Sequence, residues 1–435
     1  MKDIYVGLIG FGTVGSGVVR LLADNGDLIA GKLGARLRLK RIADLDTTSD
    51  RGLKLLPGVL TNDVNEIIND PEISIVIELI GGYEPAKSFV LKAIAAGKHV
   101  VTANKALLAL HGDEIYAKAA EAGVEVLYEA AVGGGIPVLS AIKGNMAANR
   151  FSTILGILNG TCNYILTKMT KEGLDFAVVL KSAQEMGYAE ADPTFDIEGI
   201  DTAHKLALLL SLCFGTKVRF DQIYTEGITA ISAIDINFAQ QFGYRIKLLA
   251  IGKRDGDRIE ARVHPTMIPV HYPMADVDGP FNAIRLAGDF IGPVMFYGRG
   301  AGMEATASAV VGDLMDISRN ILVGVGQRVS ARGFQDINIA DLPIKPIGES
   351  VSRYYLRFSA VDKPGVLAAI AGALGRYNIS IESMIQTGRS GDYVPIVFIT
   401  HQAVESDIQS ALAEIDGLDM IKEKSCLIRI EDNLE

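Results

Sequence analysis

The sequence predicts an α/β protein: a helix-covered parallel sheet, then an α+β region, then a small βαββαβ unit. In residues 1–132, short and continuously apolar runs alternate with helical segments, which is typical of a parallel sheet buried on both faces. Longer strands and clusters of acidic residues follow in 133–303. Residues 331–350, which include Pro343, Pro346 and Gly348, predict a linker to the last unit, 351–435.

The expected elements follow this order along the chain. Strands are expected at residues 4–9, 37–43, 73–80, 98–102, 153–158, 258–265, 353–360 and 427–430, and helices at 17–22, 86–96, 112–121, 306–323 and 366–377. The helix at 306–323 lies in a segment, 304–330, that is long enough to return to the first domain and complete it.

Composition narrows the class of protein. Hydrophobic residues make up 49% and charged residues 22% of the 435 residues, as in an ordinary globular protein. The net charge of −10 argues against nucleic acid as the main partner, because an acidic surface repels phosphates. Three widely spaced cysteines, with no long apolar run and no leader pattern, predict a cytoplasmic protein that has neither a disulfide framework nor a membrane span.

The first expected strand runs into a glycine-rich loop of the G-x-G-x-x-G type, which consists of Gly10, Phe11, Gly12, Thr13, Val14 and Gly15. In such a loop the first glycine permits a tight turn, the second lets a pyrophosphate approach the backbone, and the third lets the helix pack on the strand. Free N–H groups at the start of the next helix then face the phosphates. This Rossmann-type arrangement predicts binding of a dinucleotide.

The second expected strand ends at Asp44, the place where a carboxylate binds the adenosine ribose in such domains. Asp44 lies further from the glycines than the usual ~20 residues, and a glycine-bearing insertion at 24–35 accounts for the extra length. A carboxylate here favours NAD over NADP, because a 2′-phosphate would meet like charge, whereas Lys40, Arg41 and Arg51 weaken that preference. The alternative is that Asp44 is a simple turn residue.

A lysine follows a dense group of carboxylates in the middle of the chain. Asp201 and Lys205 are four residues apart and share one face of an expected helix. Alone they would be a surface ion pair, but four acidic residues stand just upstream: Glu190, Asp192, Asp196 and Glu198. Such carboxylates suit a substrate that bears an ammonium group, and a lysine can donate the proton to a carbonyl that receives hydride.

Two more segments carry unusual residues. Thr102 and Lys105 follow a strand, so Lys105 should lie at the carboxyl edge of the sheet, where ligands of Rossmann-type domains bind. The three consecutive glycines of 133–135 expose backbone at the end of the first domain. Their carbonyls could bind a cation or the run could be a hinge, and the residues leave these two interpretations equal.

Together these motifs resemble the homoserine dehydrogenase family over roughly residues 1–330. The matching segments are GFGTVG (10–15), TANKALLA (102–109), EAAVGGGIPV (129–138), NGTCNYIL (159–166), EADPTFDIEGIDTAHKL (190–206) and GRGAG (298–302). The resemblance implies reduction of L-aspartate 4-semialdehyde to L-homoserine with NADH or NADPH, on the branch to threonine and methionine. It also implies that 133–303 binds substrate and forms a dimer contact.

The resemblance assigns roles to particular residues. Lys205 would donate the proton to the carbonyl, and Asp201 would hold the reacting oxygen or a water. Glu190, with Asp196 nearby, would bind the substrate amino group, and Lys105 would face both the nicotinamide ribose and the substrate. A monovalent cation, usually sodium in this family, would lie among mainly main-chain oxygens; its candidate ligands here are Glu129, Val132, Gly134 and Ile136.

Two other residues near the motifs are expected to have structural roles. Hydride transfer with proton donation needs no covalent intermediate, so Cys162 is expected to be a small buried side chain. His204 would point about 100° away from Lys205 on a helix, so packing or support of neighbours suits it better than catalysis.

The last unit resembles an ACT domain, a ferredoxin-like βαββαβ module that binds small ligands. The matching residues are DKPGVL at 362–367 and NISI at 378–381. Asp362 and Gly365 would border an amino-acid site between paired modules, with Asn378 as a contact; the alternative is an assembly module without a ligand. In homoserine dehydrogenases this module implies feedback by L-threonine. We further expect a homodimer or homotetramer, and no aspartokinase domain fused to the chain.

Two other functions are kept as alternatives. Another NAD(P)-dependent amino-acid semialdehyde dehydrogenase would need a catalytic cysteine beside a base, which the surroundings of Cys162 do not supply. A catalytically inactive sensor of NAD and an amino acid would keep the fold without the chemistry, and the presence of Lys205, Asp201 and Glu190 argues against it.

Overall fold

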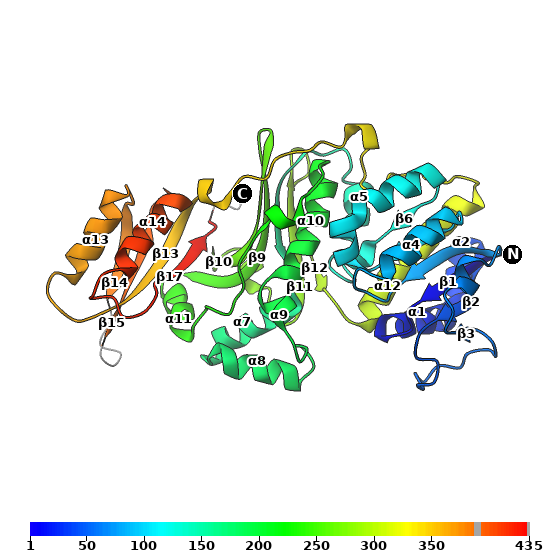
Figure 1. The fold of residues 1–435 in the computed structure, drawn as a ribbon, viewed down its shortest axis with the longest axis horizontal. Coiled ribbons are helices and arrows are strands. Elements are labelled where there is room, and N and C mark those ends of the chain that lie inside the picture. Colours follow the sequence, from blue (N-terminus) through cyan, green and yellow to red (C-terminus); the bar gives the residue numbers. More distant parts are fainter. Residues whose placement is uncertain (387–392, 433–435) are drawn as a thin grey trace. The chain divides into compact units, whose positions relative to one another are not determined.

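The computed structural model describes residues 1–386 and 393–432, which form two compact units. The first unit contains residues 1–158, 203–220 and 282–342. The second contains 159–202, 221–281 and the described residues from 343 onward. Figure 1 labels the elements, and each unit is considered by itself below.

The first unit is built on a parallel sheet with the strand order β3-β2-β1-β4-β5-β6. Successive strands are added on one side of β1 up to β3 and on its other side from β4 onward, so the strand order reverses between β1 and β4. The carboxyl ends of the strands at such a switch point open a crevice for ligands. This topology confirms the Rossmann-type sheet that the sequence predicted. Its strands are β1 (Lys2–Ile9), β2 (Ala35–Ala43), β3 (Leu60–Thr61), β4 (Ile73–Glu78), β5 (His99–Thr102) and β6 (Val126–Leu127).

Helices pack around this sheet (Figure 1). They are α1 (Thr13–Asp24), α2 (Gly26–Leu33), α3 (Asn65–Ile68), α4 (Ala86–Ala95), α5 (Lys105–Ala122) and α12 (Met303–Leu322). The late helix α12 packs closely on α1, where a Cβ at Gly17 would lie 2.7 Å from the Met303 side chain. Val18 of α1 and Leu314 of α12 are buried in one core with the strands, so α12 is part of the first unit although it follows β1 by about three hundred residues.

The structure differs from the sequence prediction at two helices, one with a misplaced start and one that was not predicted. Helix α5, expected at 112–121, begins at Lys105, because the Asn104 side chain accepts a hydrogen bond from the Leu107 N–H at 3.1 Å and so caps an earlier start. The insertion at 24–35 is largely helix α2, which ends at Gly34 with φ +77°.

The first unit also contains elements outside the parallel sheet and its helices. Strand β11 pairs antiparallel with β7 and neighbours β12. The further elements are β7 (Phe151–Ile157), β11 (Phe281–Gly288), β12 (Gly292–Arg299), the 3-10 helices η1 (Glu129–Ala131) and η4 (Asp336–Asn338), α6 (Val138–Lys143), and most of α10 (Ile200–Phe214).

The second unit contains a sheet in the order β9-β10-β17-β13-β15-β14. Strands β9 (Tyr244–Asp255) and β10 (Arg258–Pro269) form a long antiparallel hairpin, and β8 (Tyr224–Thr225) pairs parallel with β10. The helices of this part are α7 (Gly160–Glu172), α8 (Phe176–Glu185), α9 (Thr194–Ile197), α11 (Ala233–Gln241) and the 3-10 helices η2 (Phe220–Gln222) and η3 (Pro273–Asp276).

The C-terminal module, residues 351–432 in their described part, has the predicted βαββαβ order. Its elements are β13 (Val351–Ala360), α13 (Val366–Arg376), β14 (Ile381–Gln386), β15 (Val394–Thr400), β16 (Ala403–Val404), α14 (Glu405–Asp416) and β17 (Cys426–Ile430), preceded by η5 (Ile347–Glu349). Strand β17 pairs with β10 through Arg429 opposite Thr266 and Ile430 opposite Met267. The module therefore continues the sheet of the second unit.

Strand β13 is covered on both faces. Tyr354, Leu356 and Phe358 lie in a core with α13 and α14, which occupy one face of the module's sheet (Figure 1). Tyr355 and Arg357 point to the other face, as the two-residue period of a strand requires. There the Tyr355 hydroxyl (2.9 Å) and the Arg357 Nε (2.6 Å) donate to Asp235 of α11. Burial opposes ionisation of Asp235, but the hydrogen bonds and charge of Arg357 outweigh it and hold the pKa of Asp235 below its usual value.

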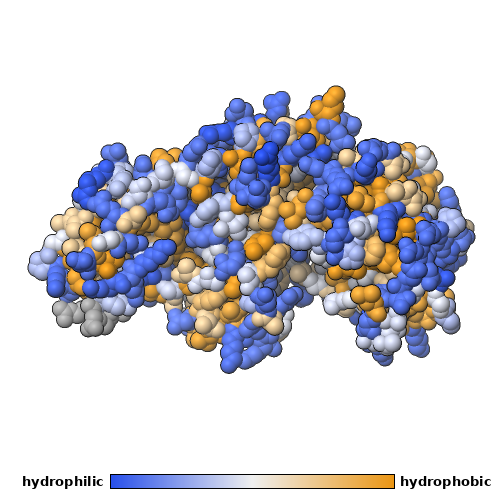
Figure 2. All heavy atoms as spheres, in the orientation of Figure 1, coloured by the Kyte–Doolittle hydropathy of each residue, from blue (hydrophilic) through white to orange (hydrophobic). Residues whose placement is uncertain are grey.

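On the face drawn in Figure 2, hydrophilic residues separate most of the hydrophobic ones. Within the described residues, we find no helix whose length and apolar character would suit a membrane crossing.

Asp235→Asn should lower the melting temperature most near pH 7 and progressively less as the pH falls below about 4. The lowered native pKa means that the ionised carboxylate stabilises the fold above its unfolded-state pKa, and that this contribution is lost as the pH falls through the native pKa. Removing one partner of a buried pair costs about 3–5 kcal/mol. Differential scanning fluorimetry between about pH 2 and 8, which extends below the unfolded-state pKa, measures the effect, with exposed Asp257→Asn as the control. A pH-independent loss in Asp235→Asn would contradict the assignment.

Candidate active site

The glycine-rich loop has the geometry that a dinucleotide pyrophosphate needs. Gly10 adopts φ +98° and donates its N–H to the Ala43 carbonyl at 2.9 Å. A Cβ at Gly15 would lie 2.2 Å from the Gly10 carbonyl oxygen, so only glycine permits this close packing of α1. A Cβ at Gly12 would meet no atom of the described chain within 4 Å, which leaves the helix N-terminus open to an anion. The loop residues therefore fit the cofactor.

An acidic and a basic side chain stand together beside this loop. The Asp44 carboxylate follows β2 and accepts the Phe11 N–H at 2.5 Å. Arg51 donates to the Phe11 carbonyl at 2.6 Å, lies 4.7 Å from the centre of the Phe11 ring, and approaches Asp44 at 3.6 Å. Lys40 and Arg41 instead form ion pairs elsewhere, with Asp70 and Glu72 and with Glu66. Of the three basic residues near Asp44 in sequence, the structure thus places Arg51 at its carboxylate.

The carboxyl edge of the sheet is held by a carboxylate that the sequence analysis missed. Glu78 ends β4, is fully buried, and accepts the Thr102 hydroxyl at 2.7 Å and the Ile80 N–H at 2.9 Å. Burial raises its pKa. Lys105 begins α5 just beyond Thr102, at the edge where the sequence predicted it. The sequence did carry a signal for Glu78, because this acidic residue ends an apolar strand shortly before Gly81 and Gly82.

Lys205 lies on α10 with only 8% of its surface exposed. Its Nζ donates to the Leu158 carbonyl at 2.6 Å. The Asn282 amide donates to the same oxygen at 3.0 Å, and a Cβ at Gly300 would overlap that amide. The lysine ammonium is thus supported by a buried carbonyl whose position Asn282 and Gly300 determine. Gly300 belongs to the GRGAG segment that the sequence analysis singled out, whereas Asn282 carried no signal in the sequence.

Asn159 joins two of the predicted carboxylates. It caps α7, accepting the Cys162 N–H at 2.8 Å, while its side-chain nitrogen donates to Asp196 at 2.7 Å and to Asp201 at 3.0 Å. Asp201 is buried and begins the first turn of α10. An asparagine before a helix predicts a cap, but its second role was not visible in the sequence.

The expected acidic group of four does not act as one cluster. Asp192 accepts the Thr194 hydroxyl at 2.6 Å, and Glu198 accepts the Thr229 hydroxyl at 3.3 Å, so both carboxylates are used by nearby turns. Glu190 is exposed, and its main-chain carbonyl accepts the Gln184 amide at 3.1 Å. Asp196 is the member that contacts the Asn159 network.

The three-glycine run meets the later GRGAG motif. Gly133 and Gly134 both have positive φ, and a Cβ at Gly134 would lie 2.5 Å from the Gly300 carbonyl oxygen. Glu129 directs its carboxylate inward to the N–H groups of Leu139 (2.8 Å) and Ser140 (2.7 Å). Among the residues that the structure describes, no group of His, Cys, Asp and Glu side chains could hold a metal ion, so a cation here would depend on main-chain oxygens. These are ligands that a hard cation accepts.

Cys162 and His204 have the packing roles expected of them. Cys162 is fully buried and its thiol contacts the Asp196 carbonyl at 3.1 Å. His204 is buried and stacks on Phe220 with ring centres 4.2 Å apart.

The predicted effector residues of the C-terminal module lie at the two ends of α13. Gly365, with φ +91°, precedes the helix, and Asp362 lies just before it. Asn378, with φ +56°, follows the helix end. Eleven helical residues span about 16 Å, so one chain does not bring Gly365 and Asn378 into a single site.

Known proteins match the chain over its whole length. The model of the homoserine dehydrogenase NAD-binding domain matches residues 10–129, the homoserine dehydrogenase model matches 137–315, and the ACT domain model matches 354–418. The homoserine dehydrogenase of Pseudomonas aeruginosa is 46% identical over 433 residues, which cover 99% of both chains. The chain belongs to the homoserine dehydrogenase family. It is an NAD(P)-dependent oxidoreductase of that family.

Other homoserine dehydrogenases support the same assignment. That of Bacillus subtilis is 38% identical over 435 residues, covering 100% of this chain and 99% of the relative. The crystal structure of a homoserine dehydrogenase from Thiobacillus denitrificans superposes with a TM-score of 0.94 at 47% identity, covering 99% of each chain. The one from S. aureus at pH 7.5 gives 0.78 at 32% identity, again over 99% of each chain.

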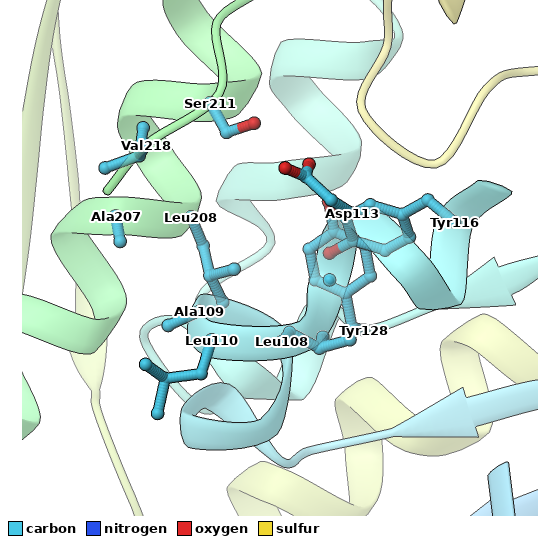
Figure 3. A pocket seen from close by; sticks show the side chains of 11 residues that line it. Leu108, Ala109, Leu110, Asp113, Tyr116, Tyr128, Ala207, Leu208, Ser211 and Val218 are labelled. Carbon is cyan, nitrogen blue, oxygen red and sulfur yellow. The ribbon is translucent and has the colours of Figure 1, made fainter. Parts of the chain in front are cut away.

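A small cavity of about 70 Å³ lies between α5 and α10 of this homoserine dehydrogenase (Figure 3). None of the residues predicted to bind cofactor or substrate lines it. Tyr116 and Tyr128 stack beside it with ring centres 5.7 Å apart. The Tyr128 hydroxyl donates to the Ala331 carbonyl at 2.8 Å, whereas the buried Tyr116 hydroxyl has no hydrogen-bond partner in the described chain. The two stacked tyrosines therefore differ in whether a hydrogen bond satisfies the hydroxyl.

Tyr116→Phe should leave the melting temperature unchanged or slightly higher, because it removes a buried hydroxyl that has no partner. Tyr128→Phe should be destabilising by about 1–3 kcal/mol, because it leaves the buried Ala331 carbonyl without its donor. Each substitution removes one hydroxyl oxygen from one of two stacked rings, so each variant is the control for the other. Equal losses of stability in thermal or urea unfolding would show that the Tyr116 hydroxyl has a partner.

Proposed function

We propose that the enzyme reversibly reduces L-aspartate 4-semialdehyde to L-homoserine with NADH or NADPH, and that Lys205 is the proton donor. The observation that carries this proposal is the Lys205 ammonium, buried on α10 and held 2.6 Å from the Leu158 carbonyl oxygen in a chain of the homoserine dehydrogenase family. A non-catalytic sensor of the same fold would have no use for a buried, oriented ammonium group.

The chemistry follows from charge development on the substrate. Nicotinamide, when bound, supplies the hydride that adds to the carbonyl carbon. Negative charge then grows on the carbonyl oxygen, where the Lys205 ammonium stabilises it and transfers its proton. In the reverse direction the Lys205 amine accepts the hydroxyl proton of homoserine. Asp201, one helical turn before Lys205, is assigned to hold the reacting oxygen or a water.

Carboxylates are assigned to the substrate ammonium group. They are Asp196 and Glu190. The assignment of Asp196 is the better supported, because the Asn159 amide fixes one of its oxygens at 2.7 Å. Glu190 is exposed and is assigned to the same group from the neighbouring turn. Lys105, at the carboxyl edge of the sheet, is assigned to the nicotinamide ribose and the substrate.

Both cofactors should be accepted, with NADH preferred. The cofactor-binding residues are those of the 10–15 loop together with Asp44 and Thr102. Asp44 disfavours a 2′-phosphate by charge repulsion, while the adjacent Arg51 supplies the positive group that such a phosphate requires.

A monovalent cation, sodium, is assigned to the main-chain oxygens of Glu129, Val132, Gly134 and Ile136. Support comes from the consecutive left-handed glycines and from the oxygen-only character of the donor set. Bound there, the cation would brace the junction between the three-glycine run and the GRGAG loop.

L-Threonine is assigned as the effector of the C-terminal module, between two paired copies of it. Asp362 and Gly365 lie at one end of α13 and Asn378 at the other, so an amino acid could contact both sets only across two chains. This favours a homodimer or homotetramer.

Lys205→Ala should lower kcat by about 100-fold or more, the usual contribution of a general acid, while dinucleotide affinity stays nearly unchanged. Loss of NADH absorbance with aspartate semialdehyde measures turnover, and NADH fluorescence titration measures binding. Full turnover in Lys205→Ala would refute the assigned chemistry. No turnover of the wild-type enzyme with either cofactor, in protein that binds dinucleotide, would favour the sensor.

Arg51→Ala should raise KM for NADPH about tenfold, as expected for losing one hydrogen bond to a charged group, and change KM for NADH much less. Arg41→Ala is the matched control, because Arg41 pairs with Glu66 instead of Asp44. Equal changes for both cofactors in Arg51→Ala would mean that Arg51 only supports the loop.

A further inference from the structure

A buried arginine of the C-terminal module contacts two carboxylates from different parts of the second unit. Arg429 of β17 is 2% exposed. It donates twice to Glu405 of α14, at 2.8 and 2.7 Å, and once to Glu226, at 2.8 Å. Glu405 belongs to the module, but Glu226 follows β8. Arg429 therefore links the module to the segment that begins at Glu226.

That segment, residues 226–229, lies against helix α9. The Ile228 N–H donates to the Ile197 carbonyl at 2.8 Å. A Cβ at Gly227 would lie 2.4 Å from the same carbonyl oxygen, so the two backbones are in direct contact. The Thr229 hydroxyl adds a hydrogen bond to Glu198 at 3.3 Å. The position of the 226–229 segment thus sets the position of α9.

Helix α9 carries Asp196, the carboxylate assigned to the substrate ammonium group. Asn159 connects Asp196 to Asp201 at the start of α10. A continuous series of contacts therefore runs from Arg429 through Glu226 and α9 to both carboxylates. Each of these contacts lies within the second unit.

We propose that Arg429 is a positioning residue for substrate binding: through Glu226 it holds the 226–229 segment against α9 and so orients Asp196. The proposal rests on the assigned role of Asp196. It gives the C-terminal module a part in the basal reaction, besides any effector that it binds. It also places the Arg429–Glu226 bridge in the series of contacts through which an effector bound to the module would change the substrate site.

The charges around the Arg429–Glu226 bridge allow the bridge to be broken without unfolding the protein. Glu405 already takes two of the Arg429 donors, so the guanidinium keeps a charged partner when Glu226 is neutralised. The Glu226 side chain is 33% exposed, so an amide in its place can be solvated. A cavity of about 510 Å³ borders Arg429 and Glu226, which gives the segment room to shift. Neutralising Glu226 should therefore loosen α9 without unfolding the enzyme.

Glu226→Gln should raise KM for homoserine about tenfold, the loss expected for one hydrogen bond to a charged group, with KM for NAD unchanged and kcat changed less than KM. Arg429→Lys keeps the positive charge but loses the planar guanidinium that donates to both carboxylates. It should likewise raise KM for homoserine and leave KM for NAD unchanged. The double variant should raise KM for homoserine no further than Arg429→Lys alone, because both substitutions break the Arg429–Glu226 bridge. Dinucleotide titration and thermal unfolding show that each variant is folded.

Glu349→Gln is the matched control. It makes the same change from carboxylate to amide at another ion pair of the second unit, Arg258–Glu349 at 2.8 Å, and the Glu349 side chain is exposed. It should leave both KM values unchanged. An unaltered KM for homoserine in Glu226→Gln, or an equal rise for both substrates, would overturn the proposal.

Two further measurements separate failure of this inference from failure of the proposed function. Asp196→Asn must itself raise KM for homoserine; if it does not, the assigned role of Asp196 is wrong. If Asp196→Asn raises KM but Glu226→Gln does not, the bridge is wrong and the substrate site stands. Calorimetry with L-threonine then tests the route: Glu226→Gln should bind threonine as the wild type does but be inhibited less, and unchanged inhibition would exclude the bridge from that route.

Discussion

Burial of the Lys205 ammonium group is the constraint on which the surrounding part of the first unit depends. A charge is tolerated away from water only where hydrogen bonds replace its hydration, and the Leu158 carbonyl supplies one at 2.6 Å. Asn282 holds the same carbonyl, and its amide fits only because Gly300 has no side chain. Gly134 approaches Gly300 in turn. Two glycine-rich motifs far apart in sequence thus come together to support one lysine.

The carboxylates of Asp196 and Asp201 are organised by a different principle. Asp196 and Asp201 would repel each other as bare ions, and Asn159 donates to both, so that one amide offsets part of two negative charges. The side chain of Asn159 also caps α7, which leaves it little freedom to turn. The Asn159 amide thereby fixes the position of both carboxylates relative to helix α7.

The C-terminal module is integrated with the rest of the second unit by buried charge. Arg357 points away from the module's own core and meets Asp235. Arg429 lies opposite Tyr354 on the face that α14 covers, and it meets Glu226 as well as Glu405. Asp235 and Glu226 precede the module in sequence by more than a hundred residues. The Arg357–Asp235 pair is strict about geometry, since displacing Arg357 leaves the fully buried Asp235 carboxylate without its opposite charge. A module attached through such pairs transmits its own displacements to its neighbours, which a flexible linker alone would not do.

The sequence by itself determined the parallel sheet, the glycine-rich loop, the order of the C-terminal module and the burial of Cys162, because each depends on residues a few positions apart: strand apolarity, turn chemistry and helical spacing. It misplaced the start of α5, treated four carboxylates as one cluster and assigned no role to Asn282, Glu78 or the second contact of Asn159. Only the tertiary structure decided these points. The Asn282–Leu158 hydrogen bond joins residues 124 positions apart, and no local preference reports a contact that exists only after the chain has folded.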